Sequence, residues 1–299
     1  MNKNISVVIN TMNEQKNIER VIESAKWADE ILICDMYSED NTVEIAKKMG
    51  AKVIFHNKEE YVEPARNFAI SKAKNEWVLV LDPDEQISDP LKRQLIRTVS
   101  EDQQVDYVRL PRKNIIFGKW MKASMWWPDY NVRFFKKDKV KWSNKIHRPP
   151  KTIGKGLNLP AEESLAIVHN HYDNVQQFLE RMIRYTKIQA NELKEEGYVF
   201  DWKDLIKKPI NEFLGRYFAS YGFKDGLHGL ALSLLQSFSF LILYIRLWEM
   251  TGYKQQELNL TELRKLSNKS AAEIDHWFKY SDLSKNPVKR FFQKVKYKI

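Results

Sequence analysis

Residues 77–85 read Trp-Val-Leu-Val-Leu-Asp-Pro-Asp-Glu, and this stretch decides the expected fold. Five apolar residues in succession are typical of a strand that is buried on both faces of a sheet. Pro83 restricts the backbone between the two aspartates that leave this strand at its carboxyl end. In an open parallel sheet, ligands bind at the carboxyl ends of the strands. Asp82 and Asp84 are therefore the first candidates for a functional site.

The chain before this stretch alternates strand and helix signals at short spacing. Such an order requires mostly parallel strands joined by right-handed crossovers. We therefore expect an α/β fold with a mostly parallel sheet and flanking helices. Gly50 follows the second helix at a position that favours a left-handed cap. Strands are predicted at residues 5–10, 31–34, 51–55 and 77–81, and helices at residues 17–27, 42–49 and 64–74.

The pattern changes after about residue 105, which suggests how the chain is divided. Short alternating stretches at residues 107–110 and 131–135 predict strands, and four tryptophans crowd the same region. Beyond Asp173 the sequence is helical nearly to its end. We expect an α/β domain over residues 1–200 and a helical, basic, membrane-associating extension over residues 201–299.

Composition limits the class of protein. The chain carries 49 Lys and Arg against 39 Asp and Glu, a formal charge of +10, and Cys34 is its single cysteine. One cysteine excludes a disulfide framework and a cysteine-based zinc site, and it fits a reducing compartment. The apolar run near the amino terminus is too short for a signal peptide. We expect a cytoplasmic protein.

The carboxyl-terminal part contains two features that suggest a surface for polyanions. From Lys285 onward there are basic and aromatic residues and no acidic ones. Such a segment attracts nucleic acid or an anionic membrane, although a solvated tail is an equal alternative. Residues 230–248 approach the length of a membrane span, but their serines and glutamine favour an interfacial or buried helix. An ordinary helical extension or a homo-oligomer interface is the alternative.

The two aspartates of the Asp82-Pro83-Asp84 sequence suit a divalent cation. Carboxylates one residue apart are typical ligands for Mg²⁺ or Mn²⁺ that is bound chiefly through substrate phosphates. The alternative is a turn whose acids cap the helix that begins after Ser88. The position after a buried strand, next to two other acidic strand-end loops, favours the metal site.

Several segments in register resemble family 2 glycosyltransferases. Residues 6–14 (Ser-Val-Val-Ile-Asn-Thr-Met-Asn-Glu) resemble that family's first strand and loop. Residues 27–42, ending in Asp35 and Ser38-Glu39-Asp40-Asn41-Thr42, resemble its second strand and loop. Residues 65–70 and 81–85 resemble its third helix and its D-x-D segment. The order and spacing match over about residues 4–90, and the subgroup most resembled builds bacterial lipopolysaccharide cores and other surface polysaccharides.

The resemblance implies a GT-A (Rossmann-like) fold and an inverting transfer from a nucleotide-diphosphate sugar. UDP is the default carrier because it is the commonest in the family. The implied acceptor is a hydroxyl of a lipid-linked or cell-surface glycan, reached on the inner face of the cell membrane. The implied metal ligands are Asp82 and Asp84. The implied donor contacts are Thr11, Asn13, Glu14, Asp35, Ser38, Arg66, Asp82 and Arg133.

An inverting transfer needs a base for the acceptor hydroxyl, and two residues are candidates for catalysis. Asp129 lies among tryptophans that would bind a sugar and raise the pKa of its carboxylate. His147 matches a histidine that glutamate often follows in the subgroup, but Arg148 stands in that place here. His169, two residues before His171, could add a metal contact, although a structural histidine is the commoner case.

Two other classes of protein compete with this interpretation. A nucleotidyltransferase also uses paired carboxylates, but its glycine-rich basic loop after the first strand is missing. No G-x-G-x-x-G or P-loop sequence occurs at the positions that would bind phosphates. A non-catalytic nucleic-acid-binding protein would gather its basic residues in one module, and none is recognisable. We therefore expect no nucleic-acid partner.

Overall fold

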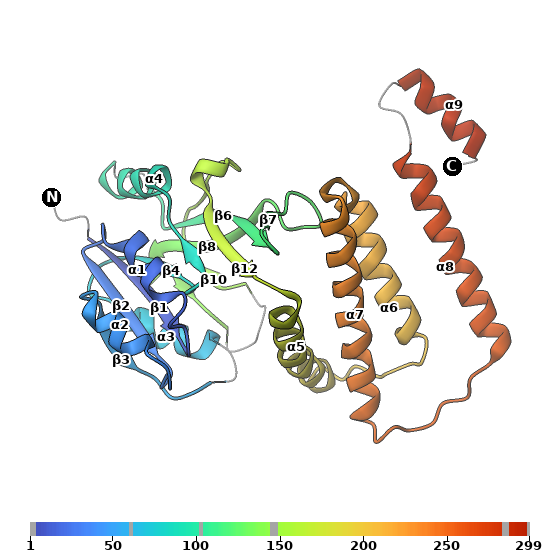
Figure 1. Cartoon of the computed structure of the whole chain (residues 1–299), viewed down its shortest axis with the longest axis horizontal. Helices are drawn as coiled ribbons and strands as arrows, with labels where there is room; N and C mark the ends of the chain where they lie inside the picture. Colours follow the sequence, from blue (N-terminus) through green and yellow to red (C-terminus); the bar gives the residue numbers. More distant parts are fainter. Residues whose placement is uncertain (1–3, 60–61, 102–103, 144–148, 283–286, 298–299) are drawn as a thin grey trace. The chain divides into compact units, whose positions relative to one another are not determined.

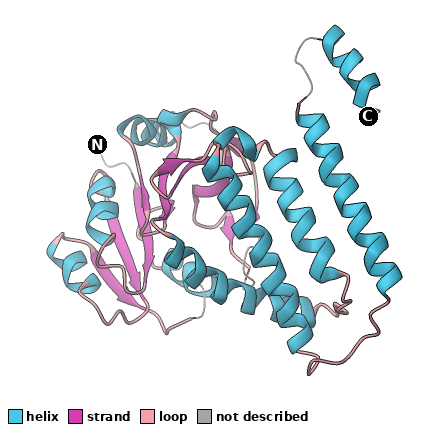
Figure 2. Ribbon diagram, turned by 45° about the vertical axis from the view of Figure 1, so that its right-hand side comes forward, coloured by secondary structure: helices cyan, strands magenta, loops and turns pink. Residues whose placement is uncertain are grey.

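The computed structural model describes residues 4–59, 62–101, 104–143, 149–282 and 287–297 (Figure 1). The chain divides into two compact units. The first contains residues 1–120 and 126–173, and the second contains residues 121–125 and 174–299. The first holds the sheet, and the second is built of helices (Figure 2). The boundary expected at residue 200 falls inside the second unit.

The first unit is built on one large sheet with the strand order β3-β2-β1-β4-β8-β6-β12-β5. Strands β3, β2, β1 and β4 are parallel, β8 is antiparallel to β4 and β6, and β12 is parallel to β6. The strands are β1 (Ile5–Thr11), β2 (Glu30–Asp35), β3 (Lys52–Phe55), β4 (Trp77–Leu81), β5 (Glu85–Gln86), β6 (Tyr107–Ile116), β7 (Lys119–Trp120), β8 (Asp129–Lys136), β9 (Val140–Lys141), β10 (Lys151–Thr152), β11 (Gly156–Asn158) and β12 (Ile167–Tyr172). The helices are α1 (Ile18–Ala25), α2 (Thr42–Lys48), α3 (Glu63–Ser71), α4 (Asp89–Ser100) and the 3₁₀ turn η1 (Glu163–Leu165).

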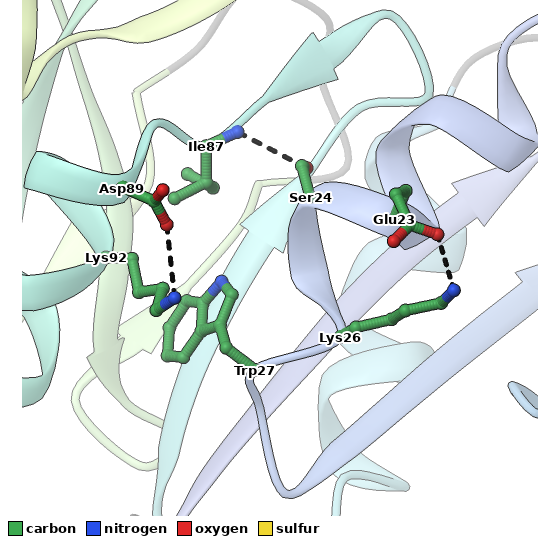
Figure 3. A pocket seen from close by; sticks show the side chains of 7 residues that line it. All are labelled: Glu23, Ser24, Lys26, Trp27, Ile87, Asp89 and Lys92. Atoms are coloured by element: carbon green, nitrogen blue, oxygen red, sulfur yellow. Dashed lines mark hydrogen bonds and ion pairs between the residues drawn. The ribbon is translucent and has the colours of Figure 1, made fainter.

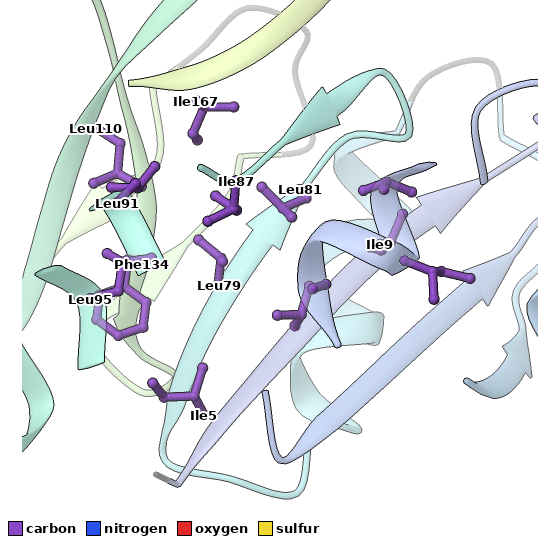
Figure 4. Close-up of a cluster of buried hydrophobic side chains, with 14 of the residues drawn as sticks. Ile5, Ile9, Leu79, Leu81, Ile87, Leu91, Leu95, Leu110, Phe134 and Ile167 are labelled. Carbon is purple, nitrogen blue, oxygen red and sulfur yellow. The ribbon is translucent and has the colours of Figure 1, made fainter. Parts of the chain in front are cut away.

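Both faces of the sheet are covered, which explains the continuous apolar runs. One face packs Ile5, Val7 and Ile9 of β1 against α1, α2 and α4 (Figure 4). The other face packs Val8 of β1 and Val80 of β4 against α3. All seven residues of β1 are buried as a result. A strand with two covered faces has no polar side, so the sequence shows a run instead of an alternation.

The expected order of strands and helices is confirmed in this unit. Gly50 ends α2 with a φ of 82°, the left-handed conformation expected there. Helix α4 begins at a cap in which Ser88 Oγ accepts a hydrogen bond from Leu91 N at 3.2 Å. The strand predicted at residues 107–110 runs on to Ile116 and therefore carries polar residues into the sheet.

The topology brings four strand ends to one edge of the sheet. The carboxyl end of β4 and the start of the antiparallel strand β8, at Asp129, both lie at this edge. Strand β6 pairs Arg112 with Asp129, and β12 pairs His169 with Asn114. The carboxyl halves of β6 and β12 therefore lie beside the start of β8, on the side where β4 ends.

The second unit packs helices around a small apolar core. That core joins Ala190 of α5 to Leu243, Tyr244 and Leu247 of α7. Asp225 is buried and accepts hydrogen bonds from Lys122 N at 3.0 Å and Ala123 N at 2.8 Å, so residues 121–125 belong to this unit. Its helices are α5 (Val175–Glu195), α6 (Asp204–Leu214), the π-helical turn η2 (Gly215–Ala219), the 3₁₀ turn η3 (Gly222–Asp225), α7 (Leu227–Glu249), α8 (Leu260–Ser281) and α9 (Pro287–Tyr297).

Helix α7 is long and apolar enough to cross a membrane by length and composition. A core helix of a soluble protein can be equally long and apolar. Several of its side chains are exposed, including Leu234, which is 52% exposed. Helix α9 is amphipathic and carries four basic residues with exposed Phe291, Phe292 and Val295.

Candidate active site

The loops that follow β1 and β2 are joined by hydrogen bonds. Thr11 Oγ1 donates to Asp35 Oδ2 at 2.8 Å. Ser38 donates to both oxygens of Asp35, through its N at 2.7 Å and its Oγ at 2.6 Å, and Ser38 Oγ accepts from Asn13 N at 2.8 Å. Asp35 is completely buried. The structure thus brings together Thr11, Asn13, Asp35 and Ser38.

Glu14 lies in the first of these loops. Its N donates to Thr42 Oγ1 at 2.7 Å, and its Oε2 accepts from Asn17 Nδ2 at 2.9 Å. Beyond β2, the ring of Tyr37 is 60% exposed and stacks on Phe55 with 5.4 Å between the ring centroids. The sequence did not identify this exposed aromatic pair, because the partners come from two separate strand ends.

Asp82 is held by two buried guanidinium groups. Its Oδ1 accepts from Arg66 Nη2 at 2.6 Å, and its Oδ2 accepts from Arg133 Nη2. Burial raises the pKa of the Asp82 carboxyl, but the charges of Arg133 and Arg66 outweigh that effect and hold the pKa well below its usual range. Both carboxylate oxygens are therefore engaged by arginine, which does not favour the predicted role of Asp82 as a metal ligand.

The charge network continues from Arg133 toward the start of β8. Arg133 Nη2 also donates to Glu85 Oε1 at 2.8 Å, and Glu85 is completely buried. Arg112 Nη1 lies 3.3 Å from the same oxygen, and Arg112 Nη2 donates to Asp129 Oδ2 at 2.6 Å. Alternating charges thus run from Arg66 to Asp129 along the edge of the sheet.

Asp129 differs from the expectation in its pKa. Burial raises the pKa of its carboxyl. The charge of Arg112 and hydrogen bonds from Asn114, Arg112 and Asn131 lower the pKa by more than burial raises it, so the pKa lies below its ordinary value. The expectation that aromatic walls raise this pKa is therefore wrong. The reason is that Arg112 pairs directly with the carboxylate, a contact that the sequence did not predict.

The structure brings Asp84 and His169 together. Asp84 Oδ1 lies 3.5 Å from His169 Nε2, and both residues are buried. His169 Nδ1 lies 2.6 Å from Asn114 Oδ1, and His171 Nδ1 lies 3.1 Å from His169 Nε2. A carboxylate and an imidazole are ligands that divalent transition ions accept, and a metal-bound histidine usually directs its other nitrogen to a fixed polar group.

These residues fit a divalent cation that is only partly coordinated by protein. Among the described residues, no group of three or more His, Cys, Asp or Glu side chains gathers as a complete metal cage would require. Asp84 and His169 would hold the ion, and phosphate oxygens and water would complete its coordination. His169, which the sequence predicts as a metal contact, thus lies next to Asp84.

Three residues of this edge escaped the sequence interpretation as site residues: Glu85, Arg112 and Asn114. Glu85 was visible only as the end of the acidic stretch. Arg112 and Asn114 are polar residues two apart in a strand, a spacing that puts both on one face of the sheet. That spacing was the available signal. His147, the second predicted catalytic residue, lies outside the described residues.

A hollow of about 430 Å³ lies between the end of α1 and the start of α4 (Figure 3). Ile87 N donates to Ser24 Oγ at 3.3 Å within it. Its charged side chains form the local ion pairs Glu23–Lys26 and Asp89–Lys92. None of the predicted site residues lines it. We therefore assign the chemistry to the strand ends and not to this hollow.

Several known proteins are similar to this chain in sequence or structure. Residues 6–153 match the model of Glycosyl transferase family 2. The uncharacterized glycosyltransferase RT0209 of Rickettsia typhi is 29% identical over 289 residues, which cover 93% of each chain. The uncharacterized glycosyltransferase RC0292 of Rickettsia conorii is 26% identical over 90% of this chain and 93% of its own. Among solved structures, S. aureus TarS 1-349 in complex with UDP covers 85% of this chain and 94% of its own, with 14% identity and a TM-score of 0.44. By the family match and the two Rickettsia relatives, the chain is a glycosyltransferase whose residues 6–153 are similar to glycosyl transferase family 2.

Proposed function

We propose that this enzyme transfers a sugar with inversion from a nucleotide-diphosphate donor, UDP-sugar by default, to a hydroxyl of a lipid-linked or cell-surface glycan. The observation that carries the proposal is the approach of Asp84 Oδ1 to His169 Nε2 at 3.5 Å. The pair stands at the sheet edge where β4 ends, and Asp84 is next in the chain to Glu85, which pairs with Arg133 and Arg112. Such an arrangement suits a diphosphate and its cation.

In this proposal each part of the edge has its own task. The hydrogen-bonded loops of Thr11, Asn13 and Asp35 bind the nucleoside, and the exposed rings of Tyr37 and Phe55 offer a face for the base. The bound cation would neutralise charge that grows on the leaving diphosphate. The arginines beside Asp82 hold its carboxylate in ion pairs, so Asp84 and not Asp82 is the carboxylate proposed for the cation.

Asp129 is the proposed acceptor of the proton from the glycan hydroxyl. Its carboxylate is ionised at neutral pH, which is the form that accepts a proton, and its lowered pKa makes it a weaker base than a free aspartate. Trp126 and Trp127 precede it in the chain, and Trp127 meets Trp120 edge-on with 5.2 Å between the ring centroids. Aromatic rings of this kind bind sugars through their apolar faces. Asp129→Asn is expected to keep nucleotide binding and lose sugar transfer.

The decisive experiment measures thermal stabilisation by UDP, GDP, dTDP and CDP, each with Mn²⁺ or EDTA. We expect one nucleotide to stabilise the wild type only with Mn²⁺, and Asp84→Ala to lose this effect. The matched control is Asp89→Ala, because the Asp89 side chain is 74% exposed and pairs only with nearby Lys92 among the contacts described. Equal stabilisation of Asp84→Ala and wild type, or none in any condition, would reject the proposal.

The proposed location is the inner, anionic face of the cell membrane. The support is helix α9, in which basic residues accompany exposed Phe291, Phe292 and Val295. Such helices bind anionic lipid through charge and apolar burial together. Co-sedimentation with phosphatidylglycerol vesicles is expected for the wild type and not for Phe291→Ser/Phe292→Ser. Lys269→Glu in α8 serves as the control. Binding that is unchanged in the double variant would exclude α9 as the contact.

A further inference from the structure

Asn114 stands between the two chemical groups of the proposed site. It is completely buried in β6. Its Oδ1 lies 2.6 Å from His169 Nδ1. Its Nδ2 donates to the main-chain oxygen of Trp126 at 2.8 Å and to Asp129 Oδ2 at 3.1 Å. One carboxamide therefore touches both the histidine beside Asp84 and the carboxylate proposed to accept the proton.

The partners of Asn114 determine which way its amide points. A carbonyl oxygen and an ionised carboxylate can only accept hydrogen bonds, and Asp129 is ionised because Arg112 Nη2 pairs with it at 2.6 Å. The amide nitrogen must therefore face Trp126 and Asp129. The amide oxygen is left to face His169, and an oxygen can only accept.

This orientation fixes the proton of His169. The imidazole must donate to Asn114 Oδ1 from Nδ1, so a neutral ring carries its lone pair on Nε2. Nε2 is the nitrogen that lies 3.5 Å from Asp84 Oδ1 and 3.1 Å from His171 Nδ1. His171 can donate to that lone pair in the absence of a cation. When a cation binds, the same lone pair is directed at it, next to the carboxylate.

We propose that Asn114 is a positioning residue that prepares His169 to bind the divalent cation and ties this ligand to Asp129. The proposal rests on the proposed function, since it assigns the cation to Asp84 and His169. Hydrogen-bond partners of metal-bound histidines set the tautomer and the ring orientation, and their loss lowers metal affinity about 10- to 100-fold. Asn114 occupies that position, because its Oδ1 is the hydrogen-bond partner of His169 Nδ1.

The test measures Mn²⁺ affinity in the presence of saturating UDP, by the electron paramagnetic resonance signal of free Mn²⁺. Asn114→Leu is expected to weaken Mn²⁺ binding at least about tenfold. The double variant Asn114→Leu/His169→Ala is expected to bind Mn²⁺ as His169→Ala does, within about threefold, because Asn114 acts through His169. A smaller loss in Asn114→Leu, or losses that multiply in the double variant, would overturn the proposal.

A matched control separates this effect from damage around Asp129. Asn131 Nδ2 donates to Asp129 Oδ1 at 3.0 Å, and its recorded contacts do not include His169. Asn131→Leu should therefore leave Mn²⁺ affinity unchanged. A loss in Asn131→Leu equal to that in Asn114→Leu would also overturn the proposal.

The tautomer can be measured on the wild type if the variants fail to fold. Histidine labelled with ¹⁵N distinguishes a protonated Nδ1 from a protonated Nε2 by nuclear magnetic resonance. We expect His169 to carry its proton on Nδ1, and a proton on Nε2 instead would overturn the inference. A wild type that binds no Mn²⁺ with UDP, GDP, dTDP or CDP would reject the proposed function, whereas normal wild-type binding with an unaffected Asn114→Leu would reject only this inference.

Discussion

Arg133→Met should destabilise the sheet unit strongly, because Arg133 is the shared cation of two carboxylates. The Arg133 side chain is 4% exposed, and its Nη2 serves both Glu85 and Asp82. Removing one partner of a buried ion pair typically costs about 3–5 kcal/mol. Asp82 keeps Arg66 at 2.6 Å and Glu85 keeps Arg112 at 3.3 Å. We therefore expect the lower end of that range, about 3 kcal/mol.

The assay is thermal unfolding followed by tryptophan fluorescence. For a unit of this size, 1 kcal/mol corresponds to about 2–4 °C, so Arg133→Met should lower the midpoint by about 6–12 °C. The matched control is Arg97→Met, which removes the Arg97–Glu101 pair at 2.5 Å. In this pair the Arg97 side chain is 65% exposed and the Glu101 side chain is 41% exposed. Exposed pairs of this kind contribute about 0–1 kcal/mol. Equal losses in both variants would refute the reasoning from burial.

Two other predictions concern pH and packing. The pKa values of Asp82 and Asp129 in the folded protein lie below their ordinary values. Both carboxylates therefore contribute stability that is present above about pH 4 and is lost as the pH falls through the folded-state pKa values. The melting temperature should stay constant from pH 7 to pH 5 and fall below about pH 4. A Cβ at Gly229 would lie 1.8 Å from the main-chain oxygen of Gly222, so Gly229→Ala should destabilise the helical unit by about 1–3 kcal/mol in denaturant unfolding followed by circular dichroism. At Gly215 a Cβ would meet nothing within 4 Å, so a loss in Gly215→Ala as large as that in Gly229→Ala would contradict this reasoning.

The strand and helix order of residues 5–81 could be predicted from the sequence because strands that are buried on both faces appear as continuous apolar runs. Val7, Val8 and Ile9 form one run because each face of β1 has its own helices. The loops of Asp35 and Asp82 could be located for the same reason, since each directly follows such a run. Local patterns therefore identified the strand ends and the residue types at them.

The partners of those residues could not be predicted, because they come from strands that are distant in the chain. Arg133 reaches Asp82 only because β8 is antiparallel to β4. His169 reaches Asp84 and Asn114 only because β12 lies beside β6. Pairing order and register depend on long-range packing, which no short window of sequence contains.

The short segment of residues 121–125 has a consequence for the order in which the chain folds during synthesis. Its partner Asp225 is translated about 100 residues later, which at about 5–20 residues per second means roughly 5–20 s. During that interval the sheet unit can form its strands, but Lys122 N and Ala123 N have not yet received their buried acceptor. Residues 121–125 therefore gain these two hydrogen bonds only after Asp225 has been synthesised, later than the sheet-unit segments on either side of them.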